Sequence, residues 1–152
     1  MTSTVTAEIE VEAPLRAVYD QWTQFEEFPE FMQMVKSVTQ VDDDLTHWVV
    51  NVGGVQREFD ALIVDQTPDD HVAWESTGER IHAGRVAFDR VDPDRTLVRL
   101  QMEWEPETFV EKTGAALNLD ERAAEMDLSR FKSFIEARGR ETGGWRGEIH
   151  NP

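Results

Sequence analysis

The chain opens on a stretch in which apolar and polar residues alternate. This period of two predicts a β-strand over residues 5–11, with one buried and one solvent-facing side. Pro14 follows, and the first turn of a helix accepts proline because its missing N–H has no partner there anyway. The next apolar residues share one helical face, which predicts an amphipathic helix carrying Leu15, Val18, Tyr19 and Trp22.

A segment rich in phenylalanine and methionine comes next. We expect a second short helix over residues 26–32, kinked near Pro29, because proline removes a backbone hydrogen bond from a helix interior. Two interpretations of the crowded apolar side chains are open. They form a gate over the mouth of a pocket, since methionine adapts to irregular shapes, or a satellite core that closes one end of a sheet. These side chains are Phe25, Phe28, Phe31, Met32 and Met34.

Between residues 35 and 105 the pattern changes to strands separated by turns. Glycine, proline and aspartate mark the turns, as at Gly53-Gly54, Thr67–Asp70 and Asp92–Asp94. Short turns between successive strands indicate an antiparallel sheet. The expected strands cover residues 46–52, 56–65, 72–76, 83–91 and 96–105.

A long helix closes the chain, from about Leu119 to Arg138, and Gly139 is its natural stop. Its apolar stripe follows spacings of four, three and four through Ala124, Leu128, Phe131 and Ile135. We therefore predict one domain over residues 1–139 and a flexible tail over residues 140–152, rich in glycine and polar residues. Within the tail, Trp145 either folds back as a flap or docks on a partner, or it is part of a disordered appendage.

The order of these elements predicts an α+β fold. A curved antiparallel sheet wraps around the long C-terminal helix, and two short helices follow the first strand. One face of the sheet and one stripe of the helix are buried together. Such an arrangement often leaves a cavity between sheet and helix.

Charge and composition narrow the possible partners. The net charge of −16, from 31 acidic and 15 basic residues, argues against nucleic acid or an anionic membrane surface. No apolar run approaches the ~20 residues that span a bilayer, so we expect no stable membrane insertion. The absence of cysteine excludes disulfides and thiolate chemistry. Together with an N-terminus that lacks a secretory signal, these features favour a cytoplasmic protein.

The order of several motifs resembles the polyketide cyclase/dehydrase family of the START-like, helix-grip (SRPBCC) superfamily. The resemblance rests on VEAPLRAVYDQWTQFEEFPEFMQMVKSV (11–38), AWEST (73–77), AGRVAFDRV (83–91) and DLSRFKSFIEARG (127–139). It implies a helix-grip fold and a cavity under the helix that takes apolar or aromatic small molecules. Some family members cyclise and dehydrate poly-β-keto chains.

One departure from that family weakens the enzymatic interpretation. In aromatic polyketide cyclases a cavity-facing arginine on a middle strand is thought to act on substrate carbonyls. The corresponding place in this chain falls near Ile63, with Ala61 beside it. Arg57, the basic residue of that strand, lies nearer the strand start.

Apolar residues on the inward phases are the candidate ligand contacts, because aromatic rings supply large apolar surfaces for stacking. The alternative is that they only fill the core. We predict ligand contacts from Phe25, Phe28, Met32, Trp48, Phe59, Trp74, Val86, Phe88, Met102, Trp104, Leu128 and Phe131.

Polar candidates for catalysis are few: Tyr19, Arg57 and Ser76. A carbonyl-activating site needs a donor near the reacting oxygen and a base beside the acidic carbon. The histidines show no metal-ligand spacing, so neither a metal nor a cofactor is expected.

Three functions remain open at this point. The first is the binding of a lipid, quinone or polyketide-like molecule in the cavity between sheet and helix. The second is a cyclase or dehydratase that acts on a poly-β-keto or related carbonyl substrate. The third is a protein-interaction module that uses the acidic surface or the tail.

Overall fold

The computed structural model describes residues 3–151 except 53, 80 and 106–120. β1 covers Ser3–Val11 and α1 covers Leu15–Trp22, with Pro14 directly before the helix, as the alternation and the helical face predict. The second helix differs from the expectation. It is a 3₁₀ helix, η1, over Phe25–Glu30 with Pro29 inside it. The tighter 3₁₀ geometry is common in short connecting pieces of this kind.

The remaining strands form one antiparallel sheet in the order β1-β7-β6-β5-β4-β3-β2, with β8 paired to β4. Each expected strand is present within one or two residues of its predicted bounds. The hydrophobic pattern of the sequence did not predict the bounds of β2 or β8. The strands are β2 (Val35–Gln40), β3 (Leu45–Val52), β4 (Val55–Thr67), β5 (His71–Ser76), β6 (His82–Asp92), β7 (Arg95–Trp104) and β8 (Ile149–His150).

The long helix α2 covers Glu121–Arg138. The start predicted at Leu119 lies outside the described residues. The residues of the predicted stripe are at most 1% exposed: Ala124, Leu128, Phe131 and Ile135. Gly139 ends the helix with φ of +75° and donates its N–H to Ile135 O at 3.0 Å, a left-handed position that favours glycine.

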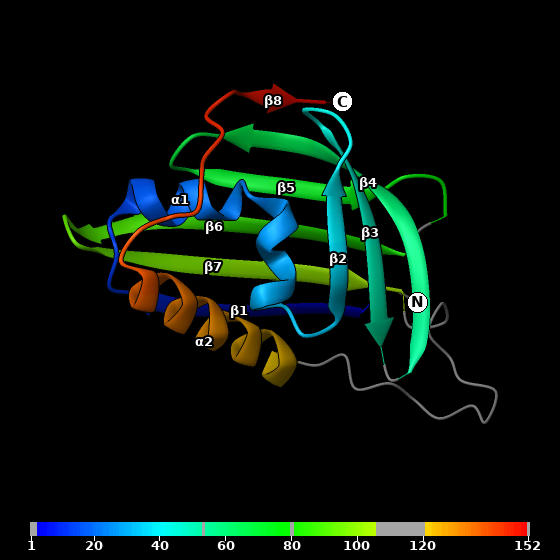
Figure 1. Ribbon diagram of the computed structural model, residues 1–152, viewed down its shortest axis with the longest axis horizontal. Helices are drawn as coiled ribbons and strands as arrows, with labels where there is room; N and C mark the ends of the chain where they lie inside the picture. The colour runs from blue at the N-terminus through cyan, green and yellow to red at the C-terminus, as the bar shows by residue number, and fades with distance from the viewer. Residues whose placement is uncertain (1–2, 53, 80, 106–120, 152) are drawn as a thin grey trace.

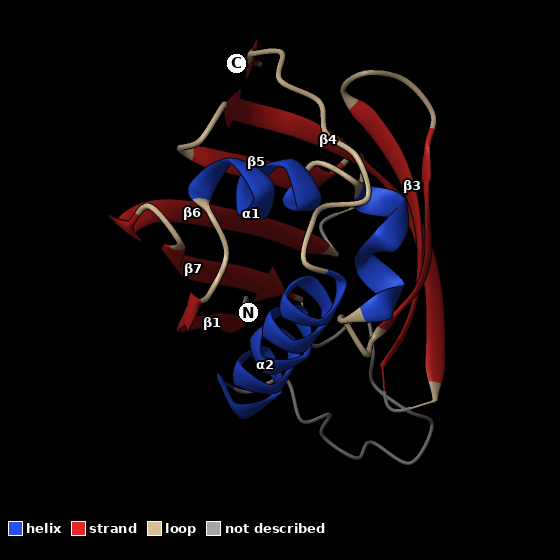
Figure 2. Ribbon diagram, turned by 60° about the vertical axis from the view of Figure 1, so that its left-hand side comes forward, coloured by secondary structure: helices blue, strands red, loops and turns tan. Residues whose placement is uncertain are grey.

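The sheet curls, and α1, η1 and α2 lie against its concave side (Figures 1 and 2). α2 packs along the edge strand β1, where two polar contacts join them. The Glu12 N–H donates to Glu136 Oε2 at 2.7 Å, and Lys132 Nζ donates to Glu10 O at 3.2 Å. The expected α+β arrangement, a curved antiparallel sheet around a C-terminal helix, is confirmed.

After α2 the chain turns back across the concave side and reaches the part of β4 that extends beyond β3 (Figure 2). There β8 pairs with β4, and Asn151 N–H donates to Val64 O at 2.8 Å. This part of β4 has a free edge because β3 pairs only with Val55–Leu62. The tail thus covers an edge that would otherwise be open to other chains. Its flexibility in solution stays a prediction.

Candidate functional site

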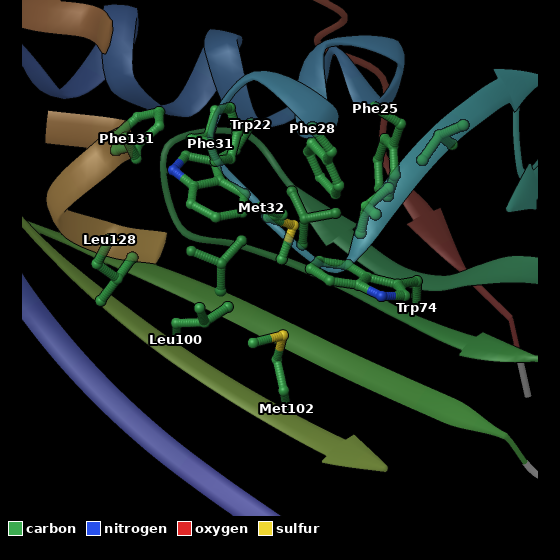
Figure 3. Close-up of a cluster of buried hydrophobic side chains, with 14 of the residues drawn as sticks. Trp22, Phe25, Phe28, Phe31, Met32, Trp74, Leu100, Met102, Leu128 and Phe131 are labelled. Atoms are coloured by element: carbon green, nitrogen blue, oxygen red, sulfur yellow. The ribbon is translucent and has the colours of Figure 1, made fainter. Parts of the chain in front are cut away.

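The space between the concave sheet face and α2 is occupied by an aromatic cluster (Figure 3). Trp22 of α1 lies at its centre, with ring centroids 5.0–5.4 Å from three phenylalanines of η1, the following turn and α2. The Trp22 ring meets the first two phenylalanine rings edge to face and the third at a tilt. Aromatic rings prefer such arrangements to a face-to-face sandwich. The aromatic cluster comprises Trp22, Phe25, Phe28, Phe31, Trp48, Trp74 and Phe131.

Phe28 joins the helical side of the cluster to the sheet. Its ring centroid lies 5.7 Å from both Trp48 of β3 and Trp74 of β5. The two indoles stack on each other at 5.9 Å, and Trp48 stacks on Phe59 at 5.7 Å. The rings are therefore in contact from the helices to the strands, and this part of the interior is a packed core.

All of the predicted ligand-contact residues belong to this core and are at most 5% exposed. The structure thus brings them together on the side where the sequence places them. In this structure these side chains fill the core, which is the second of the two alternatives given by the sequence. Contact with a ligand stays a prediction for Phe25, Phe28, Met32, Trp48, Phe59, Trp74, Val86, Phe88, Met102, Trp104, Leu128 and Phe131.

His82 is a buried polar residue of the core that the sequence pattern did not single out. Its Nε2 accepts the Trp74 indole N–H at 3.0 Å, and its Nδ1 lies 3.1 Å from Glu103 O. This pairing requires the neutral tautomer with the proton on Nδ1. Its ring also lies 4.0 Å from that of Trp104. Burial lowers the pKa of His82 to about 3, so both nitrogens serve structure rather than proton transfer.

We expect His82 to make the protein less stable in acid. The unfolded chain takes up a proton at this residue below pH 6.5, whereas the folded chain does so only near pH 3. The free energy of unfolding should therefore fall by roughly 1.4 kcal/mol per pH unit as the pH decreases through that window. Urea unfolding of the wild type and His82→Gln between pH 7 and 4 measures the effect. The gap between the two proteins should narrow with acid, and a constant gap would contradict the neutral buried histidine.

The comparison with the variant is needed because Asp127 titrates in the opposite sense. Burial raises the pKa of Asp127 to about 6, although it accepts hydrogen bonds from Gln33 N–H at 3.3 Å and Arg130 Nη1 at 2.8 Å. Stability from this group is present below pH 3.8 and is lost as the pH rises through about 6. It affects both proteins equally and cancels in their difference.

Of the three catalytic candidates, Ser76 has a structural role and Arg57 is exposed on the surface. Ser76 Oγ accepts the N–H groups of Ile81 (3.0 Å) and His82 (3.2 Å), and it thereby orders the turn between β5 and β6. Arg57 is exposed and donates to the neighbouring Gln56 O at 3.0 Å. At the place where the family resemblance expects a cavity-facing arginine, Ile63 and Ala61 are buried apolar residues.

Tyr19, the third candidate, is fully buried on α1. Its hydroxyl oxygen accepts a hydrogen bond from Gln66 Nε2 at 3.0 Å, and Arg146 lies 5.3 Å over its ring. Burial raises the pKa of Tyr19, so its hydroxyl is protonated at neutral pH. Of the three candidates, Tyr19 is the one whose side chain is fully buried.

A cavity of about 240 Å³ lies where the tail crosses η1 and β4, and we call it the tail cavity. Its apolar wall comes from Phe25, Ile63 and Trp145, and Gln66 adds a polar group. The rest of the lining is polar or small: Thr23, Gln24, Glu26, Glu27, Gln40, Asp43 and Gly144.

Contacts of two adjacent tail residues, Trp145 and Arg146, hold the tail beside this cavity. The Trp145 N–H donates to Thr23 Oγ1 at 3.0 Å. Arg146 pairs with Asp20 and with Asp69 (2.7 Å), and the buried Asp20 belongs to α1. Trp145 thus lies against the body of the protein, as the flap interpretation of the tail requires.

Gln66 is a second buried polar residue that sequence reasoning missed. Along β4 the inward phase runs through Phe59, Ala61 and Ile63, and strict alternation would continue to Asp65. The pairing of β4 with β5 shifts register between Ile63 and Asp65, and after the shift Gln66 is the buried residue. An irregularity of this kind re-aims side chains. A period of two broken within an otherwise regular strand is the signal that would have found it.

Within the described parts of the chain, no group of histidine, aspartate and glutamate side chains is arranged to hold a metal ion. Those parts also include no helix long and apolar enough to cross a membrane.

Comparison with known proteins gives a consistent picture. Residues 11–132 match the sequence profile of the family described as polyketide cyclase / dehydrase and lipid transport. A relative from Streptomyces lincolnensis, an uncharacterized 17.2 kDa protein in the melC2-rnhH intergenic region, is 51% identical over 148 residues. That alignment covers 97% of this chain and 99% of the relative.

Solved structures share the fold at low sequence identity. The Zhui aromatase/cyclase from Streptomyces sp. R1128 superposes with a TM-score of 0.69 at 15% identity, over 95% of this chain and all of that one. A START superfamily protein from Mycobacterium smegmatis gives 0.62 at 15% identity, over 89% and 95% of the two chains. The helix-grip fold expected from the motifs is thereby confirmed.

Proposed function

Because this chain belongs to the polyketide cyclase / dehydrase and lipid transport family, we propose that it binds a hydrophobic small molecule between the sheet and α2. Membership of the family supports a role in ligand binding or cyclisation. The finer proposal is a lipid, a quinone or a polyketide-like molecule. Its aromatic body would stack among the rings of the aromatic cluster, whose lining matches the mostly apolar character of small-molecule sites.

The observation that carries the proposal is the position of Phe25. Its side chain lines the tail cavity, and its ring also lies 4.6 Å from that of Phe28 and 5.5 Å from that of Trp74. Phe25 is therefore the member of the aromatic cluster that also borders an existing cavity. We infer that a ligand in the cavity would reach the other rings of the cluster if the Phe25 side chain moved aside.

The polar groups favour binding over cyclisation. A cyclase needs at least two polar side chains that converge on the reacting carbonyl. Here Tyr19 is buried against Gln66, Ser76 is engaged in a turn and Arg57 is exposed.

Replacing Phe25 with alanine tests the proposal. The change joins the cavity to the interior, so we expect menadione, a small naphthoquinone, to bind Phe25→Ala about tenfold more tightly than the wild type, since tenfold corresponds to ~1.4 kcal/mol. Isothermal titration calorimetry and native mass spectrometry measure the binding.

Phe134→Ala is the matched control. Phe134 is half-buried on α2 and contacts Phe31 at 5.9 Å from the outer side of the cluster. It should bind menadione like the wild type. Equal affinities of all three proteins, or no binding by any, would count against a site behind Phe25.

A further inference from the structure

Gln66, which lines the tail cavity, forms a buried polar pair with Tyr19, whose hydroxyl lies 3.0 Å from Gln66 Nε2. Tyr19 is 0% exposed and Gln66 is 1% exposed. Their one mutual hydrogen bond runs from Gln66 Nε2 to the Tyr19 hydroxyl oxygen. Gln66 Oε1 has no hydrogen-bond partner, and no acceptor for the Tyr19 O–H is found among the described residues.

The pair is therefore incomplete on both sides. An acceptor, Gln66 Oε1, and a donor, the Tyr19 O–H, remain after their mutual bond is made. Buried polar groups without partners are rare in folded proteins, and each lowers stability by about 1–3 kcal/mol. Gln66 lines the tail cavity and the Tyr19 hydroxyl is bonded to it, so the pair is suited to receive a partner from outside the chain.

The charges around the cavity limit what that partner is. The rim carries the carboxylates of Glu26, Glu27 and Asp43, and the described lining residues include no lysine, arginine or histidine. Negatively charged groups such as carboxylates and phosphates are disfavoured here by like-charge repulsion. The wall behind the rim is apolar and aromatic, with Phe25 and Trp145.

We propose that Tyr19 and Gln66 anchor the hydroxyl group of an uncharged aromatic ligand that enters under the tail. A hydroxyl both accepts from the Tyr19 O–H and donates to Gln66 Oε1, and so completes both groups at once. A ketone or ether completes only the tyrosine, and an ammonium group only the glutamine. The inference rests on the proposed function, because the body of the same ligand extends past Phe25.

Three naphthalene probes that differ in one group test the inference: 2-naphthol, naphthalene and 2-naphthoate. In titration calorimetry at pH 7 we expect 2-naphthol to bind about tenfold more tightly than naphthalene, and 2-naphthoate to bind more weakly than either. In Gln66→Met and Tyr19→Phe the affinity for 2-naphthol should fall about tenfold. The affinity for naphthalene should stay within about twofold, because the substitutions remove hydrogen-bonding groups and keep apolar volume.

Gln56→Met is the matched control, since Gln56 is an exposed residue of the same strand. It should leave every affinity unchanged. Urea unfolding of Gln66→Met adds an independent measurement. Because the substitution also removes the unpartnered Gln66 Oε1, we expect little loss of stability. A clear loss of stability with unchanged affinity for 2-naphthol would show that the pair is satisfied within the protein, and would overturn the inference.

The outcomes separate the inference from the proposed function. If naphthalene and 2-naphthol bind equally, or if Gln66→Met weakens both to the same extent, the anchor is wrong while apolar binding stands. If none of the probes binds, both proposals fail.

Discussion

Replacing Phe28 with alanine is expected to lower the free energy of unfolding by about 3–5 kcal/mol. Phe28 is 0% exposed and contacts rings from both the helices and the sheet. Its removal deletes apolar surface and leaves a void that the surrounding rings fill only in part. The affected partners are Trp22, Phe25, Phe31, Trp48 and Trp74. Urea unfolding monitored by circular dichroism measures the change.

The same variant also tests what the interior binds. An apolar void in a protein core takes up small aromatic molecules, so naphthalene should raise the stability of Phe28→Ala more than that of the wild type. The half-buried Phe134 supplies the control, and its alanine variant should lose only about 1 kcal/mol. A loss at Phe28 as small as that at Phe134 would mean that the aromatic cluster is not a packed core.

Replacing Gly84 with alanine is expected to destabilise the protein by about 3 kcal/mol, the upper part of the range for overpacked cores. A Cβ at this position of β6 would lie 2.3 Å from Cζ2 and 2.8 Å from Nε1 of Trp74. The indole therefore has to move, and its hydrogen bond to His82 is disrupted. Thermal and urea unfolding measure the loss, and near-ultraviolet circular dichroism reports the displaced indole.

A second substitution identifies the cause. Trp74→Phe replaces the indole with a smaller ring and should relieve the clash with the new methyl group. The double variant Gly84→Ala/Trp74→Phe should then lose less stability than the sum of the two single variants, as expected for residues in direct contact. Additive losses would refute the direct clash between the Gly84 methyl and the indole.

Local patterns predicted much of the fold because they reflect burial on one side of an element. The alternation in β1 predicted its two faces, and the stripe through Leu128 and Phe131 predicted the buried face of α2. Proline and glycine placed α1 and the end of α2 because each restricts or permits particular backbone angles. The same patterns predicted which aromatic residues face inward.

Features that depend on distant parts of the chain could not be predicted in this way. Periodicity cannot reveal that His82 meets Trp74 and Glu103, because the partners come from different strands. The tail contains too few apolar residues to indicate β8, which exists because β4 offers a free edge. The inward turn of Gln66 follows from a shift in pairing with β5.

The sequence by itself determined the helix-grip fold, the family and the side of the sheet that carries the aromatic residues. Only the tertiary structure decided that those rings pack against one another and that the tail cavity, with Tyr19 and Gln66 behind it, lies at their edge. The physical reason is that burial is set mainly by local patterns of apolar residues. Contacts between side chains and the cavities between elements depend on the register and approach of segments far apart in the sequence.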